Sequence, residues 1–231
     1  MTFIQVIDCK TRKLDELNGL MDEWVAATQG KRTATHSIVG RDRSDSTHVV
    51  EIVEFPSYEE AMQNSQLPET DRIFHELVAA CDEMPTFTDL DVVRDEQLNE
   101  IAVRTFLEEV VNSRNIDAAD ALCTDDYREH DPSLSSYDMG LAEAKRENKE
   151  ILDAFRPVLT LQGMVAEGDQ VCVRMLCTGR HVGTYRGMEA TDREISMTGH
   201  ATFRCRGGKI AESWWNMDEL SVLRQLGAVQ L

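Results

Sequence analysis

A short polar stretch near residues 94–97 divides this chain into two parts with different hydrophobic patterns. The stretch RDEQLNE has no apolar residue before Leu98, where a new helical pattern begins. A chain of 231 residues can hold two small domains, each with its own core. The sequence therefore predicts one domain over residues 1–95 and a second over residues 96–231.

Strand and helix patterns alternate along the first part. The predicted strands are residues 2–9, 34–40, 47–55 and 86–93. A helical stripe of apolar residues begins at Leu14, and Ser57 is a candidate cap for a helix that begins at Tyr58. Pro68 interrupts that helix, and a further helical stripe follows it. The resulting order, β-α-β-β-α-β, is the ferredoxin-like arrangement.

The second part places its helices first and its strands last. Helices are predicted over residues 98–113, 115–123 and 137–156, with a polar loop, CTDDYREHDP, before the third. The predicted strands are residues 158–167, 170–181, 193–206 and 209–217, and DELSVLRQLG is a closing helix. This order predicts an α+β cone in which helices cover the concave face of a curved antiparallel sheet. A cone of this size leaves a pocket at its open end.

Charge and composition exclude several classes of function. The net charge of −18, without a Lys/Arg cluster, disfavours nucleic acid, and no apolar run approaches the length of a spanning helix. The N-terminal segment carries charges where a signal peptide would be apolar, so we expect a cytoplasmic protein. No spacing of His, Cys and carboxylates predicts a metal, and no glycine-rich motif predicts a nucleotide, so we expect no cofactor.

The first part resembles antibiotic-biosynthesis-monooxygenase-like domains in its strand order, its size and the segment YEEAMQNSQLPET. The resemblance implies a ferredoxin-like dimeric α/β-barrel, in a family that includes cofactor-free oxygenases and haem-degrading enzymes. The Asn, Trp and His of the haem degraders are not matched. Trp24 lies on the first helix, the first strand offers Gln5, and His75 is a lone helical histidine. We therefore expect this domain to dimerise or to pack without chemistry of its own.

The second part carries several motifs in a familiar order. DYREHDP, VRMLCTGRHVGTYRGMEATDREISMTGHATFR and GGKIAESWWNMDELSVLRQLG resemble the SnoaL-like polyketide cyclases and the related ester cyclases of the nuclear-transport-factor-two-like superfamily. The resemblance covers residues 97–231. It implies His130, His181 and Asp218 as catalytic residues. The substrate-binding residues that we expect are Arg174, Tyr185, Phe203, Trp214 and Asn216.

One position departs from the family pattern. The best-studied cyclases carry an acid/base Asp two residues after the glycine that is Gly199 here, and this chain has Ala201 in that place. An alanine cannot move a proton, so His130 and His181 become the expected bases, because the side chain of histidine suits proton transfer near neutral pH. Arg174 stands in an apolar strand and needs a partner. That partner is Asp218, Glu212 or an acidic group of the substrate.

Together these features predict a cofactor-independent cyclase that closes a ring, by aldol-type or related chemistry, in a polyketide-like or aromatic small molecule. The first alternative is a cofactor-free oxygenase or hydroxylase component acting on a similar substrate. The second is a ligand-binding module without catalysis, which the alanine at position 201 favours. Both parts resemble families that dimerise, so we expect a homodimer.

Overall fold

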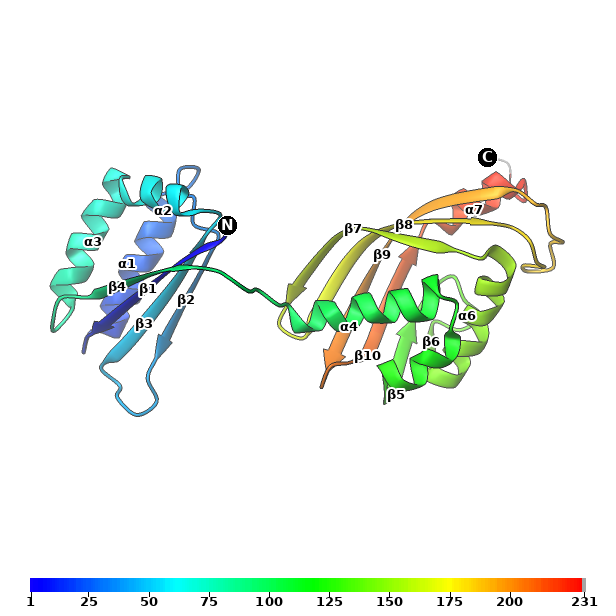
Figure 1. The fold of residues 1–231 in the computed structure, drawn as a ribbon, viewed down its shortest axis with the longest axis horizontal. Coiled ribbons are helices and arrows are strands. Elements are labelled where there is room, and N and C mark those ends of the chain that lie inside the picture. The colour runs from blue at the N-terminus through cyan, green and yellow to red at the C-terminus, as the bar shows by residue number, and fades with distance from the viewer. Residues whose placement is uncertain (230–231) are drawn as a thin grey trace. The chain divides into compact units, whose positions relative to one another are not determined.

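The computed structural model of the chain describes residues 1–229. The chain divides into two compact units, Met1–Asp95 and Glu96–Leu231 (Figure 1). Each unit has a sheet of its own and buries apolar clusters of its own. The predicted α+β class is confirmed, because both units combine helices with a sheet.

The first unit is a four-stranded antiparallel sheet with helices on one face (Figure 1). Its elements are β1 (Phe3–Lys10), α1 (Leu14–Ala27), β2 (His36–Arg41), β3 (His48–Phe55), α2 (Tyr58–Ser65), α3 (Pro68–Ala80) and β4 (Thr86–Asp91). The strands lie in the order β2-β3-β1-β4. All four predicted strands are present. Ser57 caps α2 as expected, because its side chain accepts a hydrogen bond from the backbone N–H of Glu60.

Side-chain alternation along β3 separates the two faces of this sheet. The buried side chains of the strand are those of Val49, Glu51, Val53 and Phe55. Ile52 points to the other face and is exposed, as are Ile38 of β2 and Leu90 of β4. These three residues occupy the same face because Ile38 pairs with Ile52, and Leu90 is two strands away in a matching register. One face of the sheet is therefore covered by helices, while the other carries exposed apolar residues.

The second unit has a curved six-stranded sheet with α4 and α6 against one face (Figure 1). Its elements are α4 (Leu98–Phe106), the π-helical turn η1 (Leu107–Asn112), the 3-10 turn η2 (Ile116–Ala118), α5 (Ala119–Leu122), β5 (Cys123–His130), β6 (Asp138–Gly140), α6 (Leu141–Phe155), β7 (Val158–Glu167), β8 (Gln170–Arg180), β9 (Glu194–Arg206), β10 (Lys209–Met217) and α7 (Glu219–Leu226). The strand order is β6-β5-β10-β9-β8-β7, in which only the β5–β10 pair is parallel.

The expected loop CTDDYREHDP is largely strand β5, which corrects the sequence-based prediction. Two of the residues that β5 turns inward, Tyr127 and Glu129, are polar, so the usual alternation of apolar and polar residues is masked.

The apolar stripe of the first helix in the second unit also differs from the sequence-based prediction. Leu98 and Ile101 are exposed, and Val103 is fully buried in their place.

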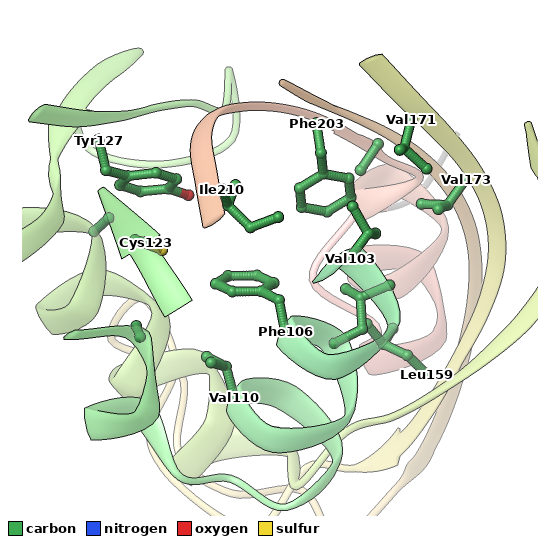
Figure 2. Packing of buried hydrophobic residues seen from close by; sticks show 14 of the residues in the cluster. Val103, Phe106, Val110, Cys123, Tyr127, Leu159, Val171, Val173, Phe203 and Ile210 are labelled. Atoms are coloured by element: carbon green, nitrogen blue, oxygen red, sulfur yellow. The ribbon is translucent and has the colours of Figure 1, made fainter. Parts of the chain in front are cut away.

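The core of the second unit lies between α4 with η1 and the sheet. Figure 2 shows Phe106 of α4 facing Phe203 and Ile210, and the rings of Phe106 and Phe203 meet edge-on with centroids 5.9 Å apart. Phe203 and Ile210 have no exposed surface. The apolar side chains of adjacent strands thus hold α4 in place on the sheet.

The C-terminus of α6 reaches β8 through close backbone contacts. A Cβ placed on Gly179 would lie 2.6 Å from the carbonyl oxygen of Phe155, which is closer than real Cβ contacts. The backbone N–H groups of Val182 and Gly183 both donate to the carbonyl of Ala154. Glycine at position 179 is therefore required for the helix end to contact the strand.

We predict that Gly179→Ala destabilises the second unit by about 1–3 kcal/mol, because the helix end has to move away from the strand. Urea unfolding followed by the fluorescence of Trp214 and Trp215 measures the change. Gly163→Ala is the matched control, since no atom lies within 4 Å of a Cβ built on that strand glycine. Equal stability of the two variants would contradict the packing described.

Candidate functional site

The second unit contains a cavity of about 130 Å³ between the inner face of its sheet and its helices. Most of the wall is apolar, and the side chains of Phe106, Val110, Leu152, Phe155, Met197 and Trp215 contribute to it. The π-helical turn η1 supplies Val110 and Val111, and turns of this kind are frequent at functional sites. A mostly apolar wall with a few polar groups is typical of small-molecule sites.

A second hollow, of about 490 Å³, adjoins this cavity and is more polar. The loops 132–135 and 184–186 and the adjacent part of α6 form it. Ser133, Ile151 and Tyr185 line both spaces, so the two adjoin at those residues. We refer to them as the inner cavity and the outer vestibule.

Glu129 of β5 is the central polar residue of the inner cavity. It lies within hydrogen-bond reach of two donors: the Tyr127 hydroxyl donates to Oε2 at 2.6 Å, and Asn148 Nδ2 donates to Oε1 at 2.7 Å. Glu129 is only 3% exposed. Its partners are neutral, so the carboxyl has no buried cation to balance its charge.

Burial raises the pKa of the Glu129 carboxyl, and the hydrogen bonds from Tyr127 and Asn148 offset only part of this rise. The pKa of Tyr127 also lies well above its ordinary value, first because of burial and then because of the nearby charge of Glu129. Tyr127 therefore remains a protonated donor. A carboxyl with a raised pKa in an apolar cavity is a candidate acid/base group.

A one-way chain of hydrogen bonds leads to Glu129. Trp215 Nε1 donates to the hydroxyl oxygen of Ser213 at 3.0 Å, and that hydroxyl lies 2.7 Å from the Tyr127 hydroxyl oxygen. Because Tyr127 uses its own proton on Glu129, Ser213 must be the donor in this contact. The sheet register allows the chain, since Ser213 of β10 pairs with Glu129 of β5.

A second cluster of polar side chains, formed by Tyr185, Arg186 and Glu219, lies where the inner cavity meets the vestibule. The Tyr185 hydroxyl donates to Glu219 Oε1 at 2.5 Å, and Arg186 Nη1 lies 3.0 Å from the same oxygen. Arg186 also donates to the backbone carbonyl of Ser133. This contact links the two loops of the vestibule. Burial, followed by the charge of Glu219, raises the pKa of Tyr185, which therefore remains a donor.

The profile of the SnoaL-like polyketide cyclase family matches residues 101–226, more than half of the chain. The chain belongs to this family. TsrD from Streptomyces laurentii is 28% identical with a TM-score of 0.51, over 59% of this chain and 99% of TsrD. A candidate polyketide cyclase from Acidithiobacillus ferrooxidans is 26% identical with a TM-score of 0.53, over 61% of this chain and 100% of that one. No curated protein sequence matches the chain.

The sequence-based expectation was that SnoaL-like motif residues would converge on this pocket, and seven of the eight expected site residues lie outside it. His130, Trp214, Asn216 and Arg174 lie outside the inner cavity. His130 stacks on Trp214 at 5.3 Å and bonds Glu212 at 2.8 Å through Nε2. Tyr127 and Glu129 take the inward positions of β5, so alternation turns His130 to the other face.

Asn216 and Arg174 are exposed and lie outside the inner cavity. Asn216 belongs to β10, and Arg174 of β8 contacts Gln162, with Nη1 3.2 Å from the Gln162 side-chain oxygen. Neither expected carboxylate partner of Arg174, Asp218 or Glu212, appears among its contacts within the described residues. Arg174 is therefore a surface residue of the second unit in this structure.

His181, Asp218 and Phe203 have packing or capping contacts instead. His181 is fully buried behind Phe155, with ring centroids 5.0 Å apart, and its Nδ1 accepts from the backbone N–H of Thr191. Asp218 caps α7 by accepting from the backbone N–H of Ser221. Phe203 belongs to the core. Among the expected site residues, Tyr185 is the one that lines the inner cavity.

Ala201 occupies the place in which the best-studied SnoaL-like cyclases carry their acid/base aspartate. Ala201 is buried between Val173 of β8 and Trp215 of β10, its register partners on the two neighbouring strands. Glu129 lies on a different strand, in the segment that the sequence analysis interpreted as a loop. The signal that could have identified it is the spacing of Tyr127 and Glu129, which puts two polar residues on one face if the segment is a strand.

The described residues contain neither a metal site nor a membrane span. Within residues 1–229, no group of three His, Cys, Asp or Glu side chains could hold a metal ion. No helix in the same range is long and apolar enough to cross a membrane. The titratable side chains that line the inner cavity include those of Glu129, Tyr127, Tyr185 and Glu219, together with those of Asp131 and Lys145.

We predict that Glu129→Gln raises the thermal stability of the second unit at neutral pH. The folded-state pKa of Glu129 is raised, so its contribution to stability is complete below the unfolded carboxyl pKa of about 4.3 and is lost as the pH rises through the folded value. The melting temperatures of variant and wild type should thus coincide near about pH 4 and diverge toward about pH 8.

Glu189→Gln is the control for this series, because Glu189 is exposed. Its melting temperature should follow that of the wild type at every pH. A Glu129→Gln variant that is less stable than the wild type at high pH would show that the hydrogen bonds outweigh the cost of burying the charge.

Proposed function

We propose that the second unit is a cofactor-independent cyclase of secondary metabolism that acts on a polyketide-like or aromatic small molecule, with Glu129 as its acid/base group. Family membership supports the substrate class. The observation that carries the proposal is a buried carboxyl of raised pKa, held by Tyr127 and Asn148 on the wall of an apolar cavity. Glu129 thereby takes the role for which Ala201 lacks the chemistry.

The proposed reaction is an intramolecular aldol closure. The Glu129 carboxylate removes a proton from a carbon between two carbonyls, and an enolate forms. The enolate carbon attacks another carbonyl of the same molecule, so that a C–C bond forms and the attacked oxygen becomes an alkoxide. Glu129 then returns the proton to this alkoxide. A carbon flanked by two carbonyls is acidic enough for one well-placed carboxylate to suffice.

The dimensions of the site indicate how such a substrate would lie. The inner cavity, at about 130 Å³, is smaller than typical ligand sites of about 300–1,000 Å³. The vestibule adds about 490 Å³ with a polar lining. We infer that the reacting, apolar end of the substrate enters the inner cavity and that its polar end occupies the vestibule. Tyr185, which lines both spaces, donates its own proton to Glu219, so it could donate to a substrate oxygen only by giving up that hydrogen bond.

We predict that Glu129→Gln lowers the turnover number for ring closure of a synthetic aromatic β-polyketone ester by about 10²-fold or more, the usual contribution of an acid/base group. Product absorbance measures the rate. His130→Ala is the informative comparison, because His130 lies outside the inner cavity and should retain most activity. If His130→Ala instead loses activity while Glu129→Gln keeps the wild-type turnover number, His130 rather than Glu129 would be the catalytic residue, as the sequence predicts.

The same assay separates the two alternative functions. An oxygenase would form product only in the presence of O₂, whereas the proposed aldol closure proceeds at equal rates under nitrogen. A ligand-binding module would bind the ester without accelerating its closure. This second alternative has one observation in its favour, namely that both oxygens of Glu129 are already held by protein donors.

We further propose that the first unit is a ferredoxin-like domain of the dimeric α/β-barrel type and that it pairs with a second copy. Its strand order β2-β3-β1-β4 supports the topology, and the exposed Ile38, Ile52 and Leu90 on the open sheet face support the pairing. Burial of such a face against a copy of itself gives a two-fold symmetric contact.

We predict that Ile52→Lys on this face converts the dimer to a monomer, because a lysine in the centre of the contact would be buried without a partner. Light scattering coupled to size-exclusion chromatography gives the mass. Val25→Lys, which changes an exposed apolar residue of α1 away from the sheet face, should leave the mass unchanged. A wild-type chain that is monomeric at high concentration would overturn the pairing.

A further inference from the structure

The first unit has a cavity of its own, of about 280 Å³, between its sheet and its helices. Its wall combines aromatic side chains from four elements, two helices and two strands, with a few polar groups. The aromatic residues are Trp24, Phe55, Phe74 and Phe87. This cavity lies entirely within residues 1–95, so its contents are independent of the chemistry proposed for the second unit.

Glu51 of β3 faces this cavity from the sheet. It occupies an inward position between Val49 and Val53, where the alternation of the strand would place an apolar residue, and it is 5% exposed. The hydrogen bond that the structure gives its side chain comes from the Ser37 hydroxyl, at 2.8 Å. Burial raises the pKa of the carboxyl above its ordinary value, and Ser37 offsets only part of the rise. A buried carboxylate is stable when a positive charge accompanies it, and Ser37 is neutral.

Asn64 faces the same cavity from the opposite side, on α2. Its side-chain oxygen is buried and has no hydrogen-bond partner, and the residue is 6% exposed. An unpaired buried amide costs stability, so native proteins pair nearly all such groups. Sheet and helix thus each present a hydrogen-bond acceptor to the cavity, one of them a carboxyl.

The charge around the cavity has one sign. Glu51 and Asp71 line it, and none of the described residues that line it is a lysine, an arginine or a histidine. The nearest indole is fixed in orientation, because Trp24 Nε1 donates to the Thr70 hydroxyl at 3.0 Å. Aromatic faces beside a carboxylate are the combination that attracts an organic cation, through the ring quadrupole and through Coulomb attraction.

We propose that this cavity binds a compact organic ammonium ion. The ammonium group donates to the Glu51 carboxylate and to the Asn64 side-chain oxygen, and the apolar part of the ligand packs against the aromatic wall. The ligand supplies the positive charge that Glu51 lacks and the donor that Asn64 lacks. Anions are excluded because no basic group among the described residues of the wall would balance them.

Three molecules of nearly equal size test the charge preference: 2-phenylethylamine, 2-phenylethanol and 3-phenylpropionate. Titration calorimetry on the full chain at neutral pH should give an affinity for the amine about tenfold or more above that for the alcohol, with no detectable binding of the carboxylate. The indole N–H signal of Trp24 in a ¹H–¹⁵N spectrum, assigned with Trp24→Phe, should shift when the amine is added. Equal affinity for alcohol and amine, no binding of the amine, or a preference for the carboxylate would overturn the proposal.

Two variants of one strand separate the role of Glu51 from a general effect of charge. Glu51→Gln should weaken amine binding about tenfold while leaving the weaker alcohol binding unchanged. Glu54→Gln removes a carboxylate from the other face of β3 and should leave both affinities unchanged. Unchanged amine binding in Glu51→Gln would overturn the proposal. Glu129→Gln should also leave amine binding unchanged, which places the site in the first unit whatever the outcome of the cyclase assay.

Asn64→Leu gives a readout that a purely structural role would not produce. Removal of an unpaired buried amide should raise the melting temperature, while loss of the acceptor should weaken amine binding. A variant that melts higher and still binds the amine with wild-type affinity would show that Asn64 takes no part in the site.

Discussion

A single irregularity in β10 decides which polar side chains reach the inner cavity of the second unit. The strand register shifts between Ile210 and Glu212, on both sides of the strand. Ile210 points into the core, so an unbroken strand would also have turned Trp214 inward. The shift instead turns Ser213 and Trp215 inward. Without it, the hydrogen-bond chain to Glu129 could not form, because Ser213 would lie on the other face of the sheet.

Much of the fold could be predicted from apolar periodicity and residue type. The long strands β8 and β9 of the second unit alternate clearly between buried and exposed residues, whereas β2 and β4 of the first unit are exposed at every residue. Strand β5 could not be found in this way, because it buries polar side chains on its inner face. Leu98 shows a related limit: it fits a helical stripe by spacing, but the buried row begins at Val103. Periodicity indicates a helix more reliably than it indicates which of its residues meet the sheet.

The candidate site was harder to predict than the fold. Family motifs identified the right segments, since His130 and Trp214 lie next to Glu129 and Trp215 in the sequence and in the sheet. A shift of one residue, however, moves a side chain to the opposite face of a strand. The sequence contains no mark of the β10 bulge, so the motif residues were assigned to the cavity and their neighbours were not. Tyr185 escaped this error because it lies on a loop at the edge of the cavity.

Two of the buried carboxyls among the described residues, those of Glu51 and Glu129, share a physical situation and differ in how it is resolved. Glu51 and Glu129 each stand on the inner face of a sheet, and burial raises the pKa of both. Glu129 accepts a hydrogen bond on each of its oxygens, which offsets part of the cost of burying its charge. The described contacts of Glu51 include one neutral donor, so its charge depends on what enters the cavity. A charged carboxylate in either place carries a desolvation cost that an apolar residue would not. We propose acid/base chemistry as the reason for the position of Glu129 and ligand recognition as the reason for that of Glu51.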